Sequence, residues 1–183
     1  VQFASIGNAT DFGDLSSKRA SMVMSCNSTT RGIFNGGYAP SPLTAFINTM
    51  EFITFASTGD AVNFGDLTAA AGSTPAGTAG NGTRGLIGLG YVAPARTNSI
   101  DFCTIATTGD AADFGDLTAI GQNYGSCSNS TRGVFLGRND PKTNIIDFVT
   151  IATTGNASDF GDVSVAESAL GAAGSDSHGG LAE

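Results

Sequence analysis

TGDAADFGD, residues 108–116, decides the fold of this chain because three close relatives of it occur elsewhere in the sequence. The chain also reads IGNATDFGD at 6–14, TGDAVNFGD at 58–66 and TGNASDFGD at 154–162. The phenylalanines of the four copies are separated by 52, 50 and 46 residues. They are Phe12, Phe64, Phe114 and Phe160. A period of this size indicates a repeat architecture such as a propeller.

Each unit contains short strands separated by turn residues. SIDFCTIAT (99–107) is rich in Ile, Phe and Thr and predicts a strand, and TMEFITFAS (49–57), IIDFVTIAT (145–153) and the shorter VQFAS (1–5) are its counterparts. The apolar segments that follow each TRG, such as RGIFNGGY and RGVFLG, predict further strands. The TTGDAADFGDLT segment is expected to form a turn, because Gly and Asx residues favour turns.

The arrangement of units along the chain predicts the fold. A unit of three or four strands in about 48 residues cannot bury both faces of its sheet alone and must pack against its neighbours. The chain begins inside one unit and stops inside another, at SDSHGGLAE (175–183), so strands from both termini would complete the last blade. We therefore expect one all-β domain, a small β-propeller of four blades, with units at roughly 1–48, 49–97, 98–144 and 145–183. The alternative is a β-repeat segment of a trimeric fibre.

Charge and composition exclude some classes of partner. The formal net charge is −8 and the eight Lys and Arg residues are scattered, which argues against binding nucleic acid through its phosphates. No apolar run approaches the roughly 20 residues of a membrane helix, so no membrane insertion is expected. Cys26 and Cys127 occupy a repeat position that Ala79 fills in another unit, which indicates a small buried side chain.

The order of segments within a unit resembles a divergent kelch repeat. A TRGVF strand, a glycine pair as in NGGY (35–38), a variable loop and a strand of the IDF type follow one another, although the chain has no Trp where kelch units carry one. The tandem units also resemble those of tail-fibre-like and other virion structural proteins of phages, notably cyanobacterial ones. The sequence features that carry this resemblance are NxIDFxTIATTGNAxDFGDLT and SNxTRGVF.

The resemblance implies a function as well as a fold. It implies four kelch-like blades and a non-enzymatic virion structural protein, located in the virion or outside the cell, as part of a tail fibre or capsid-surface appendage. Its implied role is host-surface recognition or particle assembly. The implied partners are other virion proteins and a host-surface glycan or protein, and self-association into a homo-oligomer is left open. The alternative is a secreted or cell-surface carbohydrate-binding propeller, similar to a lectin.

Oxygen-bearing side chains recur every third residue in each copy of the opening motif, a spacing that calcium-binding loops also use. Asp110, Asp113 and Asp116 are the best calcium candidates. However, Asn replaces Asp in several copies and no Glu supplies a bidentate ligand, so we favour side chains that hold turns through hydrogen bonds to backbone N–H groups. No cofactor is expected, and calcium remains the alternative.

The last Asp of each motif and the Arg of TRG suggest a repeated ion pair within or between units. The predicted pairs are Asp14 with Arg31, Asp66 with Arg84, and Asp116 with Arg132. In the fourth unit the corresponding residues are Asp162 and His178, so the single histidine is interpreted as a repeat variant rather than a catalytic base.

Binding is expected in the loops that differ between units, since variable loops on a repeated scaffold usually carry recognition. The side chains there most able to contact a sugar or a protein are Tyr38, Tyr91 and Arg138. No enzyme activity is expected, because four similar carboxylate motifs do not form the one asymmetric constellation that catalysis requires.

Overall fold

A computed structural model describes residues 8–21, 23–72, 77–139 and 141–167. Within these ranges the secondary structure consists of β-strands, which confirms the all-β class. The terminal segments predicted to close the last blade, together with His178, lie outside the described residues.

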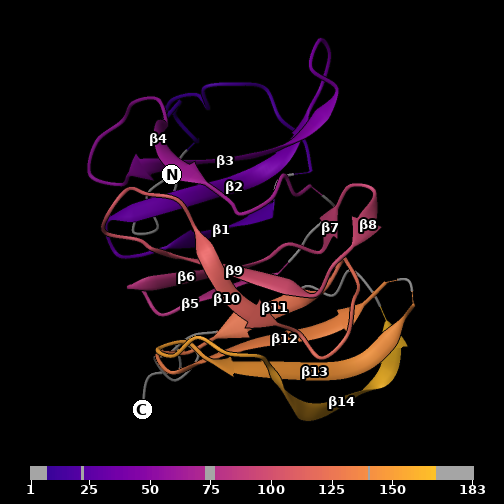
Figure 1. Cartoon of the computed structure of the whole chain (residues 1–183). Coiled ribbons are helices and arrows are strands. Elements are labelled where there is room, and N and C mark those ends of the chain that lie inside the picture. The colour runs from indigo at the N-terminus through magenta and orange to yellow at the C-terminus, as the bar shows by residue number, and fades with distance from the viewer. Residues whose placement is uncertain (1–7, 22, 73–76, 140, 168–183) are drawn as a thin grey trace.

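Three four-stranded antiparallel sheets, each a simple meander, follow one another along the chain (Figure 1). The first sheet contains β1 (Val23–Asn27), β2 (Arg31–Ala39), β3 (Ala45–Thr54) and β4 (Val62–Asp66). The second contains β5 (Thr78–Gly80), β6 (Arg84–Gly88), β9 (Ser99–Thr104) and β10 (Ala112–Asp116). The third contains β11 (Gly125–Ser128), β12 (Arg132–Arg138), β13 (Thr143–Thr150) and β14 (Ser158–Glu167). A small hairpin of β7 (Tyr91–Val92) and β8 (Ala95–Arg96) projects from the second sheet.

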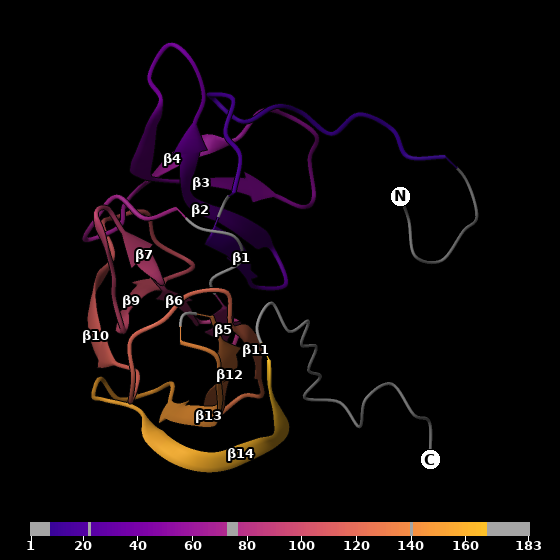
Figure 2. The same cartoon turned by 90° about the vertical axis from the view of Figure 1, so that its right-hand side faces the viewer.

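The sheets lie one against the next in an open stack, and no closed ring of blades is present among the described residues (Figure 2). The first strands of the sheets are neighbours, since β1 contacts β5 and β5 contacts β11. Each sheet takes its first two strands from one sequence unit and its last two from the next, so the sheets are out of phase with the units inferred from sequence. The strands predicted at 49–57, 99–107 and 145–153 and after each TRG are confirmed.

The FGD segment was predicted to be a turn, and this prediction is wrong. It forms the fourth strand of each sheet, in β4, β10 and β14. In β10, Asp113 pairs with Asp101 and Gly115 with Ile100, so Phe114 is an extra residue that forms a β-bulge. Gly115 has φ of 140°, which side chains rarely adopt, and this explains why glycine follows the bulged phenylalanine.

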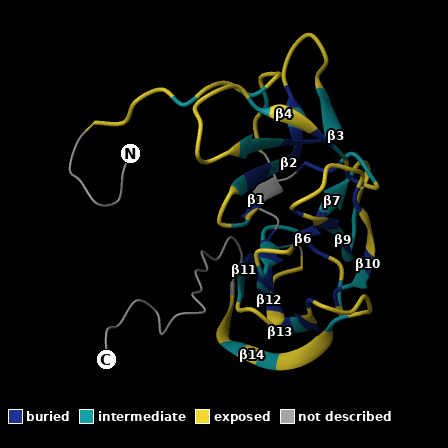
Figure 3. Cartoon of the chain, turned by 90° about the vertical axis from the view of Figure 1, so that its left-hand side faces the viewer, coloured by how far each residue is buried: buried dark blue, intermediate teal, exposed yellow. Residues whose placement is uncertain are grey.

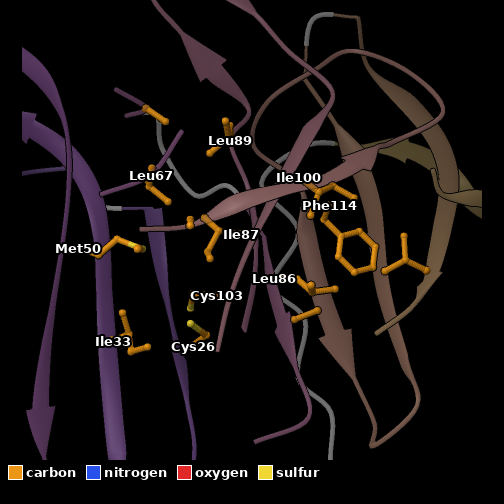
Figure 4. Packing of buried hydrophobic residues seen from close by; sticks show 14 of the residues in the cluster. Cys26, Ile33, Met50, Leu67, Leu86, Ile87, Leu89, Ile100, Cys103 and Phe114 are labelled. Carbon is orange, nitrogen blue, oxygen red and sulfur yellow. The ribbon is translucent and has the colours of Figure 1, made fainter. Parts of the chain in front are cut away.

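The core lies between the sheets and is built from their apolar faces (Figure 4). Gly85 of the second TRG faces the first sheet so closely that a Cβ there would lie 2.3 Å from Cys26 Sγ. Gly133 of the third TRG faces Ala79 in the same way, at 2.9 Å from its Cβ. Cys26 and Ala79 are both buried, which confirms the small buried position predicted from their exchange, whereas Cys127 in the last sheet is only half-buried.

Candidate functional site

The repeated motif connects each unit to the one before it. The N–H groups of Gly109 and Ala111 donate to the carbonyl oxygens of Phe64 and Asp66, at 2.7 and 2.8 Å. The same two bonds recur at the other two junctions. In the first, Gly59 donates to Phe12 and Ala61 donates to Asp14. In the last, Gly155 donates to Phe114 and Ala157 donates to Asp116. The outer edges of β4 and β10, and the FGD segment at 12–14, are therefore paired with the TGD segment of the next unit.

The Asx side chain of each TGD segment adds a third bond to this junction. Asp110 Oδ1 accepts from the N–H of Asp66 at 3.0 Å, Asp60 accepts from Asp14 at 3.0 Å, and Asn156 accepts from Asp116 at 3.1 Å. Asn serves as well as Asp because only one oxygen is used. These side chains accept from backbone N–H groups as predicted, but the N–H groups belong to the preceding unit and not to a local turn. We call the two backbone bonds and this side-chain bond the unit junction.

A carboxylate cluster suited to a metal ion is not found among the described residues. Of the three calcium candidates, Asp110 is engaged in the unit junction, and Asp113 and Asp116 lie on β10. Calcium binding by this motif stays an alternative prediction.

The ion pairs predicted between the motif and the TRG arginines are wrong. Arg31 and Arg84 each donate instead to two carbonyl oxygens of the next sheet, at 2.8 to 3.3 Å. The acceptors of Arg31 are Ile105 and Ala106. The acceptors of Arg84 are Ile151 and Ala152. Each guanidinium also stacks on a phenylalanine of its own sheet, with Arg84 Cζ 4.6 Å from the centre of the Phe102 ring. A planar, multiply hydrogen-bonding cation suits this combination of ring and carbonyls.

Arg132 occupies the same position in the last sheet and behaves differently. It stacks on Phe148 at 4.8 Å, but no carbonyl of the described residues accepts a bond from it, and its side chain is exposed. The arginine thus loses its inter-sheet contacts where the stack of described sheets stops.

A second set of buried contacts involves an acidic residue on the third strand of a sheet, such as Asp101 on β9. Asp101 accepts from both the N–H and the hydroxyl of Thr68, at 2.7 to 2.9 Å. Thr68 belongs to the FGDLT segment of the preceding unit, so this contact also joins units. Burial raises the pKa of the Asp101 carboxyl, and the hydrogen bonds from Thr68 oppose that rise.

Arg138 was predicted to contact a ligand, and this prediction is wrong. Its side chain is fully buried, where it forms an ion pair with Asp147 and donates to the carbonyl of Ala119 at 3.0 Å. Asp147 also accepts from Thr118, in the position that Asp101 and Thr68 occupy in the second sheet. Arg138 therefore neutralises a buried carboxylate.

Tyr38 and Tyr91, the other two predicted binding residues, come together in one aromatic cluster. The ring of Phe46 lies between them, edge-on to each, with ring centres 5.5 Å apart in both pairs. Tyr38 and Phe46 are partners on β2 and β3, and Tyr91 is on β7 opposite Arg96 of β8. Two segments far apart in sequence thus present three aromatic rings together.

These side chains line a shallow groove of about 340 Å³, which we call the aromatic groove. It is lined by Ser21, Tyr38, Phe46, Gly72, Tyr91, Arg96 and Gln122. Sequence reasoning missed Phe46, Arg96 and Gln122. Phe46 and Arg96 lie in the same variable loops that pointed to Tyr38 and Tyr91, and Gln122 lies in the variable stretch before the third TRG, so variation between units could have indicated all three.

Apolar rings with nearby amide and guanidinium groups can bind a small polar molecule that has one flat apolar face. Aromatic side chains supply contact area, and their polar neighbours supply orientation. The aromatic groove has no residue pair arranged as a nucleophile with its base. The described residues that line it include no Asp, Glu, His, Cys or Lys.

The cysteines contribute to packing rather than to a reactive site. All three are free thiols, and Cys26 and Cys103 face each other across the first and second sheets (Figure 4). The hydrogen bond with Cys26, together with burial, raises the pKa of Cys103. A protonated, buried thiol is a poor nucleophile.

Comparisons with known proteins do not assign this chain to a family. No protein-family model matches it, and no curated protein matches it either. Within the part of the chain that the structure describes, no helix is long and apolar enough to cross a membrane.

Proposed function

We propose that this protein is a non-enzymatic recognition scaffold of a virion appendage, which binds a host-surface glycan in the aromatic groove. The observation that carries the proposal is the cluster of Tyr38, Phe46 and Tyr91 beside Arg96 and Gln122. The C–H face of a sugar ring is apolar and packs on aromatic rings, while its hydroxyl groups need hydrogen-bonding partners at the edge. The groove offers both kinds of surface.

The scaffold that we propose is a propeller-like arrangement of kelch-like blades. Support comes from three meander sheets in succession, whose first strands are neighbours, and from unit junctions that connect the FGD strands to the TGD segments. Closure of a four-blade ring by the two termini depends on residues outside the described ranges and stays a prediction.

Binding to a glycan array tests the groove. We expect Tyr91→Ala to lower binding to the recognised sugar about fivefold or more, because a stacked ring contributes about 1 kcal/mol beyond the area that it buries. Phe55→Ala is the matched control, since Phe55 is an exposed aromatic residue that does not line the groove. Equal binding by Tyr91→Ala and the native protein would refute glycan recognition by the groove.

The virion assignment needs a separate experiment, because a secreted or cell-surface lectin could use the same groove. Mass spectrometry of purified particles distinguishes the two. We expect the chain among the virion proteins, and its absence from particles together with its presence in the medium or at the cell surface would favour the lectin.

A further inference from the structure

The last FGD motif has a different environment from the two motifs before it in the chain. Phe64 and Phe114 are 2% exposed, whereas Phe160 is 57% exposed. A Cβ on Gly65 or Gly115 would collide with a carbonyl of the next unit, at 2.2 and 2.5 Å, whereas a Cβ on Gly161 would meet nothing within 4 Å. The difference therefore lies in what covers the motif.

The backbone geometry of the last motif matches the others. Asp159 pairs with Asp147 and Gly161 with Ile146, so Phe160 is bulged as Phe114 is. Gly115 and Gly161 share φ of 140°. The outer edge of β14 thus keeps the conformation that accepts a TGD segment at the other junctions, and Figure 3 shows this strand largely exposed.

Other side chains of the third sheet indicate the same open surface. Arg132 has no carbonyl acceptor among the described residues, although Arg31 and Arg84 each have two. The N–H of Asp162 likewise has no described Asx acceptor, although Asp66 and Asp116 have one. We call Phe160, Gly161, Asp162 and Arg132 the end face.

The complementary group is at the other end of the stack. Asn8 and Ala9 align with Asp60 and Ala61, yet they are exposed and join no unit junction with the described residues. The segment that carries them leaves the first sheet at the opposite end of the molecule from β14 (Figures 1 and 2). One end therefore offers the acceptor edge of a unit junction and the other offers its donor segment.

We propose that the end face docks the Asn8–Ala9 segment of a second copy of this chain, so that copies associate head to tail. In this arrangement the N–H of the second copy's Ala9 donates to Asp162 O, and its Asn8 Oδ1 accepts from the N–H of Asp162, as at the three junctions within the chain. Because such an interface joins two different surfaces, each added copy leaves one free surface at each end of the assembly. The assembly therefore grows until it closes into a ring, or it extends as a filament. This inference does not depend on what the aromatic groove binds.

A long exposed edge strand supports this occupant. Exposed strand edges with unpaired backbone groups are templates for pairing with another chain. The donor segment carries the same Asx-Ala sequence that pairs with this edge inside the molecule, and so fits it without a new type of contact. Phe160 would then be covered as Phe114 is.

Sedimentation velocity of the full chain over a concentration series tests the proposal with two variants. Phe160→Ser changes the end face and Ala9→Pro removes the donor N–H, and both positions are exposed, so we expect both variants to fold. We expect the native protein to form dimers and larger species, and each variant alone to raise the dissociation constant at least about tenfold. Leu43→Ser is the control, because it removes an equally exposed apolar side chain outside the end face.

Mixing the two variants gives the sharpest result. Each variant keeps one intact end, so a head-to-tail interface predicts one-to-one heterodimers that stop at two copies. A native protein that stays monomeric, or oligomers that neither variant weakens, would overturn the proposal. A monomer whose Phe160 is shielded by its own N-terminus would overturn it too, and would favour the single-chain ring.

Discussion

The role of the FGD glycine is tested by Gly115→Ala, compared with Gly161→Ala. The two glycines occupy the same repeat position with the same φ of 140°. A Cβ on Gly115 would lie 2.5 Å from the carbonyl oxygen of Gly155, whereas one on Gly161 would meet nothing within 4 Å. Both substitutions impose the same backbone strain, so the difference between their free energies of unfolding measures what the unit junction contributes to stability.

The expected size of this difference follows from the bonds that the Cβ would push apart. Gly155 and Ala157 donate to Phe114 and Asp116 at 2.7 Å, and Asn156 Oδ1 accepts from Asp116 at 3.1 Å. Three hydrogen bonds at about 1 kcal/mol each give a difference of about 3 kcal/mol in the free energy of unfolding. For a chain of this size that corresponds to roughly 6–12 °C in Tm.

Urea and thermal unfolding, followed by circular dichroism, provide the assay. The measurement is made at a concentration at which the native protein is monomeric, so that docking at Gly161 does not contribute. Equal destabilisation by the two substitutions, within about 0.5 kcal/mol, would show that both variants lose stability through backbone strain alone and that the unit junction contributes nothing.

Three further predictions concern the buried charges and the arginine stacks. Burial raises the folded-state pKa of Asp101 above its unfolded value of about 4, so the stability that its carboxyl contributes is complete below the unfolded pKa and is lost as pH rises through the folded-state pKa. Asp101→Asn should therefore lose less stability than the native protein over this pH range, as measured by urea unfolding of both proteins. Arg138→Ala should cost about 3–5 kcal/mol in urea unfolding because it leaves Asp147 buried without its cation, and a cost below about 1 kcal/mol would contradict the ion pair. Arg84→Ala should cost about 1.5 kcal/mol more than Arg132→Ala, since both stack on phenylalanine but only Arg84 also binds two carbonyls, and equal costs would mean that the carbonyl bonds contribute nothing.

The sequence allowed the repeat, the all-β class and most strands to be predicted, because these depend on local composition and on spacing. The FGD strand was not predicted, because its Gly and Asx residues favour turns locally. The partner that pairs with its outer edge lies in the next unit, some 40 to 50 residues away.

The contacts of individual side chains could not be predicted from residue types alone. Complementary charge suggested that Arg84 pairs with Asp66, but the nearest acceptors are carbonyls of the next sheet, and only the stacking of sheets brings them close. Tyr38 and Tyr91 were chosen for their loops, and their meeting around Phe46 depends on how the β7–β8 hairpin lies against the first sheet. Phe160 shares its sequence context with Phe114, and only its place in the stack makes it exposed.

Amide hydrogen exchange, measured residue by residue by NMR, tests most directly whether the repeated motif holds successive units together. We expect slow exchange at Gly109, Ala111 and Asp66, and at Gly155, Ala157 and Asp116, because each of these N–H groups donates within a unit junction. The exposed amides of the same TGD segments, such as Thr108, provide the fast-exchanging reference. Exchange at all six junction amides as fast as at Thr108 would show that the unit junctions do not hold successive units together.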